Sequence, residues 1–284
     1  MRIAVASGKG GTGKTTIATN LASMLAESGE RVTYIDCDVD EPNGRLFLKP
    51  DIDEARDVNV PVAFVNEERC TGCGQCGSTC RYHALANTGK RVIIFPEMCR
   101  GCGACALSCP TGAISLIPRH VGKITLGRAG PLRFVEGRMN VGEVATTEII
   151  RELKRLRTDG VAILDAPPGT ACPAVEAIRN VDRTFLVTEP TPFGLHDLRL
   201  AVGVVRSMKV EAGVIINRCD VGDSRVRDYC REEGLDVLLE VRNDRKVAEA
   251  YAGGELPWRV VPHFRDAIAS LAESLADLTA RKSS

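Results

Sequence analysis

Aromatic residues are scarce in this chain, and neither sign of charge is in excess. Phe, Trp and Tyr make up 4% of the 284 residues, and 37 Lys and Arg residues balance 37 Asp and Glu residues. Because the chain also has no long basic block, we do not expect nucleic acid as a partner. Hydrophobic residues still make up 44% of the chain, which is enough for a sizeable core. The shortage of aromatic residues favours a parallel sheet of aliphatic side chains.

Long hydrophobic runs are absent as well. No apolar stretch approaches the roughly 18 residues that a membrane-spanning helix needs. The opening residues, MRIAVASGKG, lack the charged segment and apolar segment of an export signal, so we expect a cytoplasmic protein with reduced thiols. A predicted C-terminal helix has an apolar stripe over residues 264–278, but its polar face is acidic. Since anionic lipid requires a basic face, we expect no stable membrane anchoring.

Cysteine, by contrast, is abundant. Eight of the 12 cysteines form two runs with the same spacing, C-x2-C-x2-C-x3-C, and Pro110 follows the second run. This spacing is typical of bacterial ferredoxins, in which three thiolates hold one 4Fe-4S cluster and the fourth reaches the other cluster. Structural zinc sites use paired C-x2-C knuckles without a third cysteine two residues further on, and disulfides need an oxidising compartment. Both alternatives therefore fit the runs less well.

Crossed ligation assigns four cysteines to each of two 4Fe-4S clusters. The first predicted set is Cys70, Cys73, Cys76 and Cys109. The second predicted set is Cys99, Cys102, Cys105 and Cys80. The first run has Arg81 where the second run has Pro110, and because proline there only assists the local conformation, the match is weakened slightly.

The N-terminal segment carries a phosphate-binding pattern. Residues 2–7 are a short apolar run, and apolar residues recur at helical spacing over residues 17–25, which predicts a strand, a loop and a helix. The loop between them, GKGGTGKT, satisfies G-x-x-x-x-G-K-[ST]. In such a loop the backbone N–H groups face the phosphates, Lys14 neutralises them and the Thr15 hydroxyl binds Mg²⁺. The predicted nucleotide-binding residues here are Gly8, Lys9, Gly10, Gly11, Thr12, Gly13, Lys14, Thr15 and Thr16.

The additional Lys9 makes this loop resemble the deviant Walker A ATPases of the MinD and Mrp superfamily, which includes the nitrogenase iron protein. The resemblance implies an α/β fold, with the doubly wound, mostly parallel sheet of a P-loop NTPase. It also implies hydrolysis of ATP to ADP with Mg²⁺ in a dimer, formed with a second copy or with a related ATPase. Lys9 would contact the phosphates of the partner subunit. The alternative for Lys9 is a solvated loop charge.

Acidic residues after two further predicted strands extend the resemblance. One strand ends at Asp36 and is followed by CDVDEPN, and another ends at Asp165 in the segment DAPPG. Carboxylates at the carboxyl ends of parallel strands point into the ligand crevice. The resemblance implies that Asp36 and Asp38 organise Mg²⁺ and the attacking water, whereas Asp40 is as readily a turn residue. The catalytic candidates are Lys9, Lys14, Asp36, Asp38 and Asp165, and the Mg²⁺ ligands are Thr15, Asp38 and Asp165.

Two later segments complete the match. Residues 188–191, TEPT, resemble a segment of the same ATPases, and the resemblance places Asn217 and Arg218 beside the adenine base. Cys172 follows Asp165 by seven residues, as a cluster-ligating cysteine does in the nitrogenase iron protein. No clear second cysteine accompanies it, so a packing or loop thiol is the stronger interpretation. The other three cysteines, Cys37, Cys219 and Cys230, lack ligand spacing and are expected to be packing residues.

The cysteine-rich segment interrupts the ATPase-like sequence. We assign residues 1–57 and 119–284 to a MinD-like ATPase domain, and residues 58–118 to a small inserted α+β ferredoxin-like domain. The edges of the insert, residues 49–54 and 117–122, are expected to be exposed loops, where insertions are tolerated. Helices are expected at about residues 143–157, 194–208, 222–234, 243–252 and 264–280.

Two functions remain open. In the first, ATP-driven dimer closure is coupled to electron transfer through two 4Fe-4S clusters to a redox partner protein, with slow ATPase activity when the partner is absent. In the alternative, the chain is a Mrp-like, ATP-dependent assembly factor that delivers an iron-sulfur cluster or metallocluster to a client protein. The lack of a labile C-x-x-C pair outside the insert favours the first hypothesis.

Overall fold

The computed structural model of the protein describes residues 1–89 and 91–283, and the side chains up to residue 275. Two compact units divide the chain. The large unit consists of Met1–Arg56, Ile124–Arg138 and Ile149–Ser284, and the small unit consists of Asp57–Lys123 and Met139–Glu148. The small unit thus extends beyond the predicted end at residue 118 and includes a second segment that the sequence did not assign to it.

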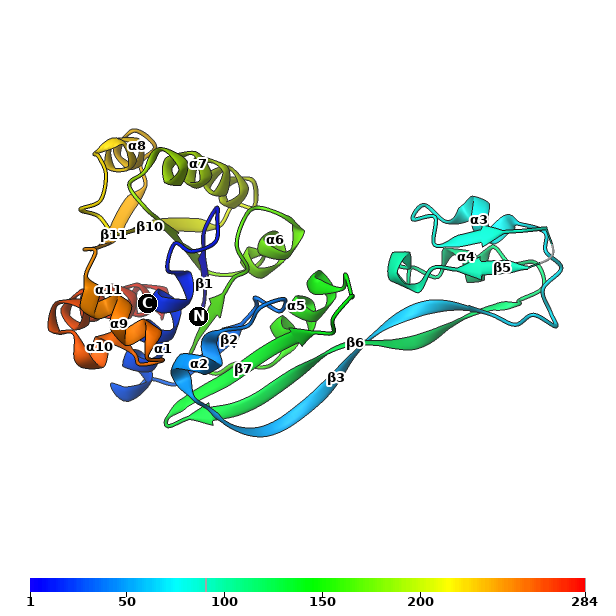
Figure 1. Ribbon diagram of the computed structural model, residues 1–284, viewed down its shortest axis with the longest axis horizontal. Helices are drawn as coiled ribbons and strands as arrows, with labels where there is room; N and C mark the ends of the chain where they lie inside the picture. Colours follow the sequence, from blue (N-terminus) through cyan, green and yellow to red (C-terminus); the bar gives the residue numbers. More distant parts are fainter. Residues whose placement is uncertain (90, 284) are drawn as a thin grey trace. The chain divides into compact units, whose positions relative to one another are not determined.

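A nine-stranded sheet has the order β11-β10-β9-β1-β8-β2-β7-β6-β3 (Figure 1). Its strands are β1 (Arg2–Ala6), β2 (Val32–Asp36), β3 (Asp51–Val65), β6 (Ile114–Ala129), β7 (Leu132–Met139), β8 (Val161–Asp165), β9 (Arg183–Thr188), β10 (Glu211–Asn217) and β11 (Asp236–Val241). The pairs β1–β8, β1–β9, β9–β10, β10–β11, β2–β8 and β2–β7 are all parallel. This arrangement confirms the predicted α/β fold with a mostly parallel sheet.

Helices cover both faces of the parallel strands (Figure 1). The helix α1 (Lys14–Glu27) packs against β1, β2 and β8, and against α11 (Pro262–Ser283). The other face carries α6 (Cys172–Ile178), α7 (Pro192–Ser207) and α8 (Arg225–Glu232). The remaining helices of the large unit include α2 (Gly44–Leu48), α9 (Arg245–Ala252) and α10 (Pro257–Val260). The helix α5 (Thr146–Arg155) begins in the small unit and ends in the large one.

The apolar stripe of the C-terminal helix faces the core. Phe264, Ile268, Leu271 and Leu275 are each at most 2% exposed, and they share one hydrophobic cluster with α1 and the central strands. The stripe is therefore a packing face as far as residue 275, and Leu278 lies outside the described side chains. Among the described residues, no helix is long and apolar enough to span a bilayer.

The prediction that residues 49–54 and 117–122, at the edges of the insert, form loops was wrong. Residues 51–54 lie in β3 and residues 117–122 lie in β6, which are strands of 15 and 16 residues. The first residues of β3, DIDEARD, have the composition of a loop, because most of them are charged and exposed. They can be so because β3 is the last strand of the sheet. Edge strands tolerate such charges and also proline, such as Pro61. The alternating hydrophobic pattern of a half-buried strand is consequently missing.

The small unit has few regular elements and a small core. It contains α3 (Gln75–Thr79), α4 (Ala104–Leu107) and an antiparallel pair formed by β4 (Leu85–Asn87) and β5 (Val92–Ile94). Its buried cluster consists of Ala63, Cys76, Ala84, Leu85, Cys105 and Ile114. Three more cysteines, Cys80, Cys99 and Cys109, pack against this cluster. Five of the cysteines thus belong to this core or pack against it.

Candidate functional site

The phosphate-binding loop connects β1 to α1, and two of its glycines are required by close approaches. A Cβ on Gly8 would lie 2.3 Å from the carbonyl oxygen of Asp197 in α7. A Cβ on Gly13 would lie 2.6 Å from Nδ2 of Asn217, and Gly13 also has a left-handed backbone with φ of 95° at the start of α1. The glycines therefore allow the loop to pack against α7 and β10 as well as to turn its N–H groups toward a ligand.

A cavity of about 460 Å³ opens beside this loop. The predicted residues that line it are Gly10, Gly11, Gly13, Lys14, Thr15, Thr16, Asp38, Asn217 and Arg218. Lys14 is 7% exposed, and burial lowers the pKa of its ammonium while Asp165 and Asp38 oppose that shift. The structure thus brings a buried cation, loop N–H groups and a carboxylate to one space large enough for a nucleotide.

Three buried acidic residues form a row across neighbouring strands. The parallel register pairs Asp36 of β2 with Asp165 of β8 on one side and with Glu136 of β7 on the other, and each is 1% exposed. Arg45 donates to Glu136 through Nε at 2.8 Å. Burial raises the pKa of Asp36 well above its ordinary value, and the neighbouring Asp165 raises it further. The sequence did not identify Glu136, because its role depends on the strand register.

Asp165 has a free oxygen next to the loop. The Tyr34 hydroxyl donates to its Oδ2 at 2.9 Å, whereas Oδ1 is buried without a hydrogen-bond partner in the described part of the chain. Burial raises the pKa of Asp165, and the nearby Thr15 hydroxyl and Lys14 ammonium oppose that shift. An unsatisfied carboxylate oxygen beside a threonine hydroxyl fits a Mg²⁺ ligand set. Tyr34 was not predicted, although it lies two residues before Asp36 and so shares its strand face.

Asp36 holds the loop that carries Asp38. Its Oδ1 accepts the N–H of Asp38 at 3.1 Å, and its Oδ2 accepts the N–H of Gly44 at 2.9 Å. Asp38 itself lines the cavity, and burial together with Asp165 raises its pKa to about 6 while Lys14 opposes the shift. Neither Asp36 nor Asp165 is among the described residues that line the cavity. Both oxygens of Asp36 accept backbone N–H groups of this loop, which is the geometry of a residue that positions Asp38.

The cavity is also lined by the predicted base-binding pair and by several residues without a motif. Asn217 donates through Nδ2 to the carbonyl oxygen of Thr12 at 2.8 Å, and its Oδ1 accepts the N–H of Arg218 at 3.0 Å. The unpredicted lining residues that come after β11 include Arg242, Asn243, Asp244, Val247, Ala248 and Tyr251. Their position after β11 could have identified them, since loops at the carboxyl ends of parallel strands line the ligand crevice.

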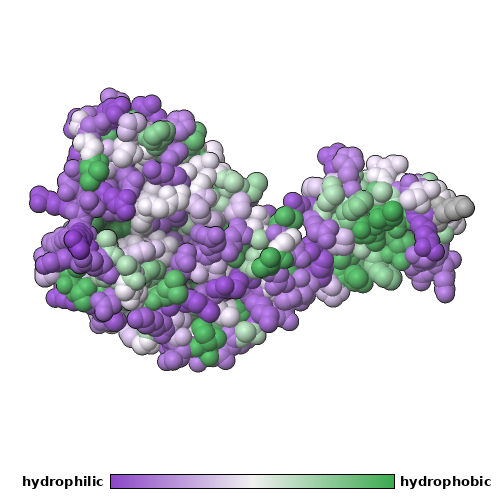
Figure 2. Space-filling model, viewed as in Figure 1, coloured by the Kyte–Doolittle hydropathy of each residue, from purple (hydrophilic) through white to green (hydrophobic). Residues whose placement is uncertain are grey.

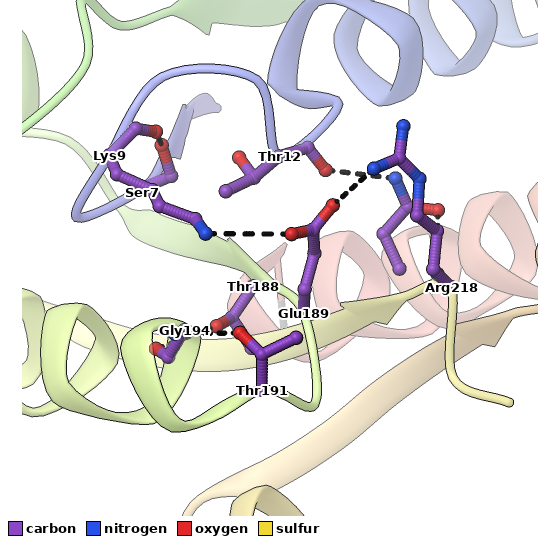
Figure 3. A network of polar contacts seen from close by, with 9 residues as sticks. Ser7, Lys9, Thr12, Thr188, Glu189, Thr191, Gly194 and Arg218 are labelled. Atoms are coloured by element: carbon purple, nitrogen blue, oxygen red, sulfur yellow. Dashed lines mark hydrogen bonds and ion pairs between the residues drawn. The ribbon is translucent and has the colours of Figure 1, made fainter. Parts of the chain in front are cut away.

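Lys9 lies outside the cavity. Its ammonium is 3.5 Å from Oε2 of Glu189, and Arg218 donates to Oε1 of the same carboxylate at 2.8 Å (Figure 3). The residues that line the cavity, within the part of the chain described here, do not include Lys9. The two lysines of the loop therefore have different surroundings.

The two cysteine runs of the small unit fold alike. In the first run Gly72 and Gly74 have φ of 71° and 81°, and in the second run Gly101 and Gly103 have φ of 62° and 75°. A short helix follows each pair, α3 in the first run and α4 in the second. Left-handed glycines curl the backbone, and in the first run Cys70, Cys73 and Cys76 line one cavity.

One of the two predicted cysteine sets lines a common cavity. Cys70, Cys73, Cys76 and Cys109, which form the first crossed set, line one small cavity. Of the second set, Cys105 belongs to the buried cluster of the small unit, as Cys76 of the first set does, and Cys80 and Cys99 pack against it. Cys102 is exposed, like Cys73 of the first set. No three His, Cys, Asp or Glu side chains of residues 1–89 and 91–275 converge as ligands of a single metal ion. A cubane has its thiolates around four corners and so needs wider spacing than one ion does.

Backbone donors reach the last cysteine of each run. The N–H of Ala84 lies 3.4 Å from Sγ of Cys80, and the N–H of Ala113 lies 3.3 Å from Sγ of Cys109. Such N–H groups stabilise thiolates and tune the potential of a bound cluster. The equivalent bonds in both halves support two sites of the same kind.

The cysteines outside the runs differ in exposure. Cys37 and Cys230 are buried, and burial raises the pKa of Cys230 to about 11. Cys172 is exposed at the first residue of α6, and Cys219 is partly exposed. Burial agrees with a packing role for Cys37 and Cys230.

The surface of the small unit is rich in hydrophobic side chains, and Figure 2 shows them gathered on the visible face of this unit. The exposed residues include Phe64, Tyr82, Ile93, Phe95, Met98, Leu107, Leu116 and Ile117. Leu107 is 90% exposed and lies in the sequence between Cys105 and Cys109.

Comparisons with known proteins agree with this description of the large unit. The family model of the CobQ/CobB/MinD/ParA nucleotide binding domain matches residues 3–258. An uncharacterized protein of Methanocaldococcus jannaschii is 30% identical over 259 residues, which is 90% of each chain. An iron-sulfur cluster carrier protein of Aquifex aeolicus is 26% identical over 269 residues, covering 89% of this chain and 60% of the relative. The structure of the Pyrococcus furiosus cell division ATPase MinD aligns with a TM-score of 0.59 at 19% identity, covering 98% of both chains.

Proposed function

The chain belongs to the CobQ/CobB/MinD/ParA nucleotide-binding family, and from this premise we propose that it is an ATPase that couples nucleotide-driven dimer closure to electron transfer through two 4Fe-4S clusters. One observation carries the proposal. The same chain holds a nucleotide-sized cavity beside Lys14 and two cysteine groups with equivalent N–H donors to sulfur. Neither feature alone requires the other, so their presence in one chain points to a joint function.

The large unit supplies the groups that phosphoryl transfer needs. Backbone N–H groups of the loop and the start of α1 face the phosphates, and Lys14 neutralises charge that develops on the transferred group. Thr15, Asp38 and the free Oδ1 of Asp165 would hold Mg²⁺, which supplies further neutralisation of the phosphate oxygens. Asp38 is mostly ionised at neutral pH, because its pKa of about 6 lies below 7, and it can accept a hydrogen bond from the attacking water.

Dimer formation would complete this site. Lys9 belongs to the loop but lies away from the cavity of its own subunit, which supports a role at the phosphates of a partner subunit. The partner would be a second copy or a related ATPase.

The small unit would bind the two clusters through the crossed cysteine sets. Bound 4Fe-4S clusters each supply one-electron transfer, at a potential set by burial and by hydrogen bonds to sulfur. The exposed hydrophobic residues beside the cysteines, such as Met98 and Leu107, support docking of a redox partner protein.

A second function is favoured by the relatives named iron-sulfur cluster carrier proteins. In this alternative the chain would deliver a cluster to a client protein in a nucleotide-dependent way. Four thiolates for each cluster predict tight retention, whereas a carrier must release its cargo. Rapid transfer of iron and sulfide to an apo-protein would therefore favour the carrier.

The decisive experiment is a redox titration of anaerobically reconstituted protein, monitored by EPR, with and without Mg-ATP. We expect two redox-active clusters whose signals or potentials shift when Mg-ATP is added. Lys14→Met is the matched control, because it should remove the nucleotide effect and retain both clusters. Two redox-silent clusters would refute electron transfer. Two redox-active clusters whose signals and potentials do not change with Mg-ATP would favour the carrier function.

A further inference from the structure

Glu189 holds two functional cations with one carboxylate. It follows β9 directly, and its side chain is only 12% exposed. Oε1 accepts from Arg218 at 2.8 Å, while Oε2 forms an ion pair with Lys9 at 3.5 Å (Figure 3). Arg218 lines the nucleotide cavity and Lys9 belongs to the phosphate-binding loop. The carboxylate therefore bridges two parts of the candidate site without lining the cavity itself.

The backbone around Glu189 is fixed from several sides. Thr191 donates its N–H to the carbonyl oxygen of Glu189 at 2.8 Å, and Gly194 packs so closely on that oxygen that a Cβ would lie 2.1 Å from it. A Cβ on Gly222 would lie 1.8 Å from the carbonyl oxygen of Pro190. Because these approaches hold the turn in place, the carboxylate is preorganised, unlike that of a flexible surface ion pair.

The two cations are not held equally. Arg218 makes the short, hydrogen-bonded contact although its side chain is 52% exposed, whereas the Lys9 ammonium is farther away and its side chain is 33% exposed. Lys9 can therefore leave without stranding a buried, unpaired carboxylate, since Arg218 stays. The longer distance makes the Lys9 ion pair the weaker of the two contacts, so it can break and yet favour the resting position of Lys9.

We propose that Glu189 is a positioning residue that retains Lys9 outside the phosphate site and so limits nucleotide-dependent association and hydrolysis. The Lys9 ammonium must break its ion pair with Glu189 before it can reach the phosphates of any bound nucleotide. The inference rests on the proposed function, because it assumes that Lys9 acts on phosphates after this release. It adds to that function a restraint that belongs to the same subunit.

The variant Glu189→Gln tests the restraint. Its amide oxygen can still accept from Arg218, but the attraction for the Lys9 ammonium is lost. We expect the association constant with Mg-ATP, measured by analytical ultracentrifugation, and the ATPase kcat/KM each to rise about 3- to 5-fold, the size of a partly exposed ion pair. Glu240→Gln is the matched control, because it removes the same charge from the Glu240 pair with Arg227 in the large unit and should change neither value.

A double-mutant cycle with Lys9→Ala shows whether Glu189 acts through Lys9. In that background Glu189→Gln should have no effect on association or hydrolysis. A persistent effect would mean that Glu189 acts through Arg218 and would overturn the inference. Unchanged or weaker association of Glu189→Gln in the presence of Lys9 would overturn it as well.

A second variant and a direct measurement of Lys9 keep the inference testable if Glu189→Gln fails to fold. They also separate failure of this inference from failure of the proposed function. Glu189→Asp keeps the charge but shortens its reach, so it should act in the same direction with a smaller effect. Acylation of Lys9 by an amine reagent, referenced to exposed Lys209, should be faster in both variants than in the wild type, and equal rates would contradict the restraint. If the wild type neither associates with Mg-ATP nor hydrolyses it, the proposed function fails. If it does both and the variants match it, only the restraint fails.

Discussion

The large and small units use left-handed glycines for different kinds of site. In the large unit, Gly11 and Gly13 shape one loop, and the rest of the cavity comes from residues at the ends of strands that are far apart in the sequence. In the small unit, two loops of the same spacing carry both the glycines and the cysteines. A local motif therefore describes most of the cysteine sites, whereas it describes only one wall of the nucleotide cavity.

The same difference extends to stability. The sheet of the large unit buries long rows of aliphatic residues against α1 and α11. The core of the small unit consists of a few residues, two of which are Cys76 and Cys105 of the predicted ligand sets. So small a core rarely stabilises a fold without a metal or a cross-link. Bound clusters would thus contribute to the folding of the small unit, whereas the hydrophobic core of the large unit stabilises that unit without them.

Loss of one cluster is the largest expected effect. Cys76→Ala and Cys109→Ala should each remove the same cluster and about half of the iron, because both thiols line one cavity although they belong to different runs. Iron analysis and EPR of reconstituted protein measure this, and nucleotide affinity reports on the large unit, which should be unaffected. Cys230→Ala, a buried cysteine of the large unit, is the control and should retain all iron. Loss of different clusters in the two variants would refute crossed ligation.

Removal of the Lys154 ammonium should destabilise the large unit. Its Nζ donates to the carbonyl oxygens of Glu176 at 2.7 Å and Ala177 at 3.1 Å, and also to that of Arg179, at the end of α6. Lys154→Met leaves these oxygens without that donor, and we expect the free energy of unfolding to fall by about 2 kcal/mol. Denaturant unfolding measured by circular dichroism checks this.

The pH dependence of the same variant has a definite sign. Burial lowers the pKa of Lys154 to about 8, below its ordinary value of 10.5. Between these pH values the folded state binds fewer protons than the unfolded state, so the stability of the wild type relative to Lys154→Met should rise from pH 8 to pH 10. A constant difference over that range would contradict the lowered pKa.

The Tyr34 hydroxyl should have a smaller effect on the same unit. It donates to the buried Asp165 at 2.9 Å, so Tyr34→Phe leaves a second carboxylate oxygen without a partner. We expect a loss of about 1 kcal/mol in the free energy of unfolding and weaker binding of Mg-ADP. Calorimetry with and without Mg²⁺ measures both. Tyr229→Phe, on α8, is a control that should not change nucleotide binding; equal losses in both variants would argue against a special role for Tyr34.

The smallest effect concerns the two halves of the small unit. His83 has φ of 52° at the position that corresponds to Gly112 in the second run, where φ is 60°. His83→Gly should relieve that strain and raise stability by about 0.5 kcal/mol, whereas Gly112→Ala should lower it by about 1 kcal/mol. Thermal unfolding of the reconstituted small unit within the full chain, followed by cluster absorbance, compares them. Changes in the same direction would show that the two turns are not equivalent.

Much of the architecture could be predicted from local patterns. The mostly parallel α/β sheet, the five predicted helices and the buried stripe of α11 follow from hydrophobic periodicity, which reports burial directly. The polar edge strand β3 escaped prediction because it buries little, so its pattern resembles that of a loop. Similarly, Arg242 and Tyr251 line the nucleotide cavity without a motif, since they face it only after β11 takes its place beside β10.

By itself, the sequence determined which groups could do chemistry: the loop of residues 8–15, the acidic strand ends and the two cysteine runs, because these depend on residue type and short spacing. Only the tertiary structure decided how they are combined. Strand register placed Asp165, Asp36 and Glu136 in one row, and the turn after β9 placed Glu189 between Lys9 and Arg218. Such contacts join residues that are distant in the chain, so their geometry follows from sheet pairing and packing rather than from any local pattern.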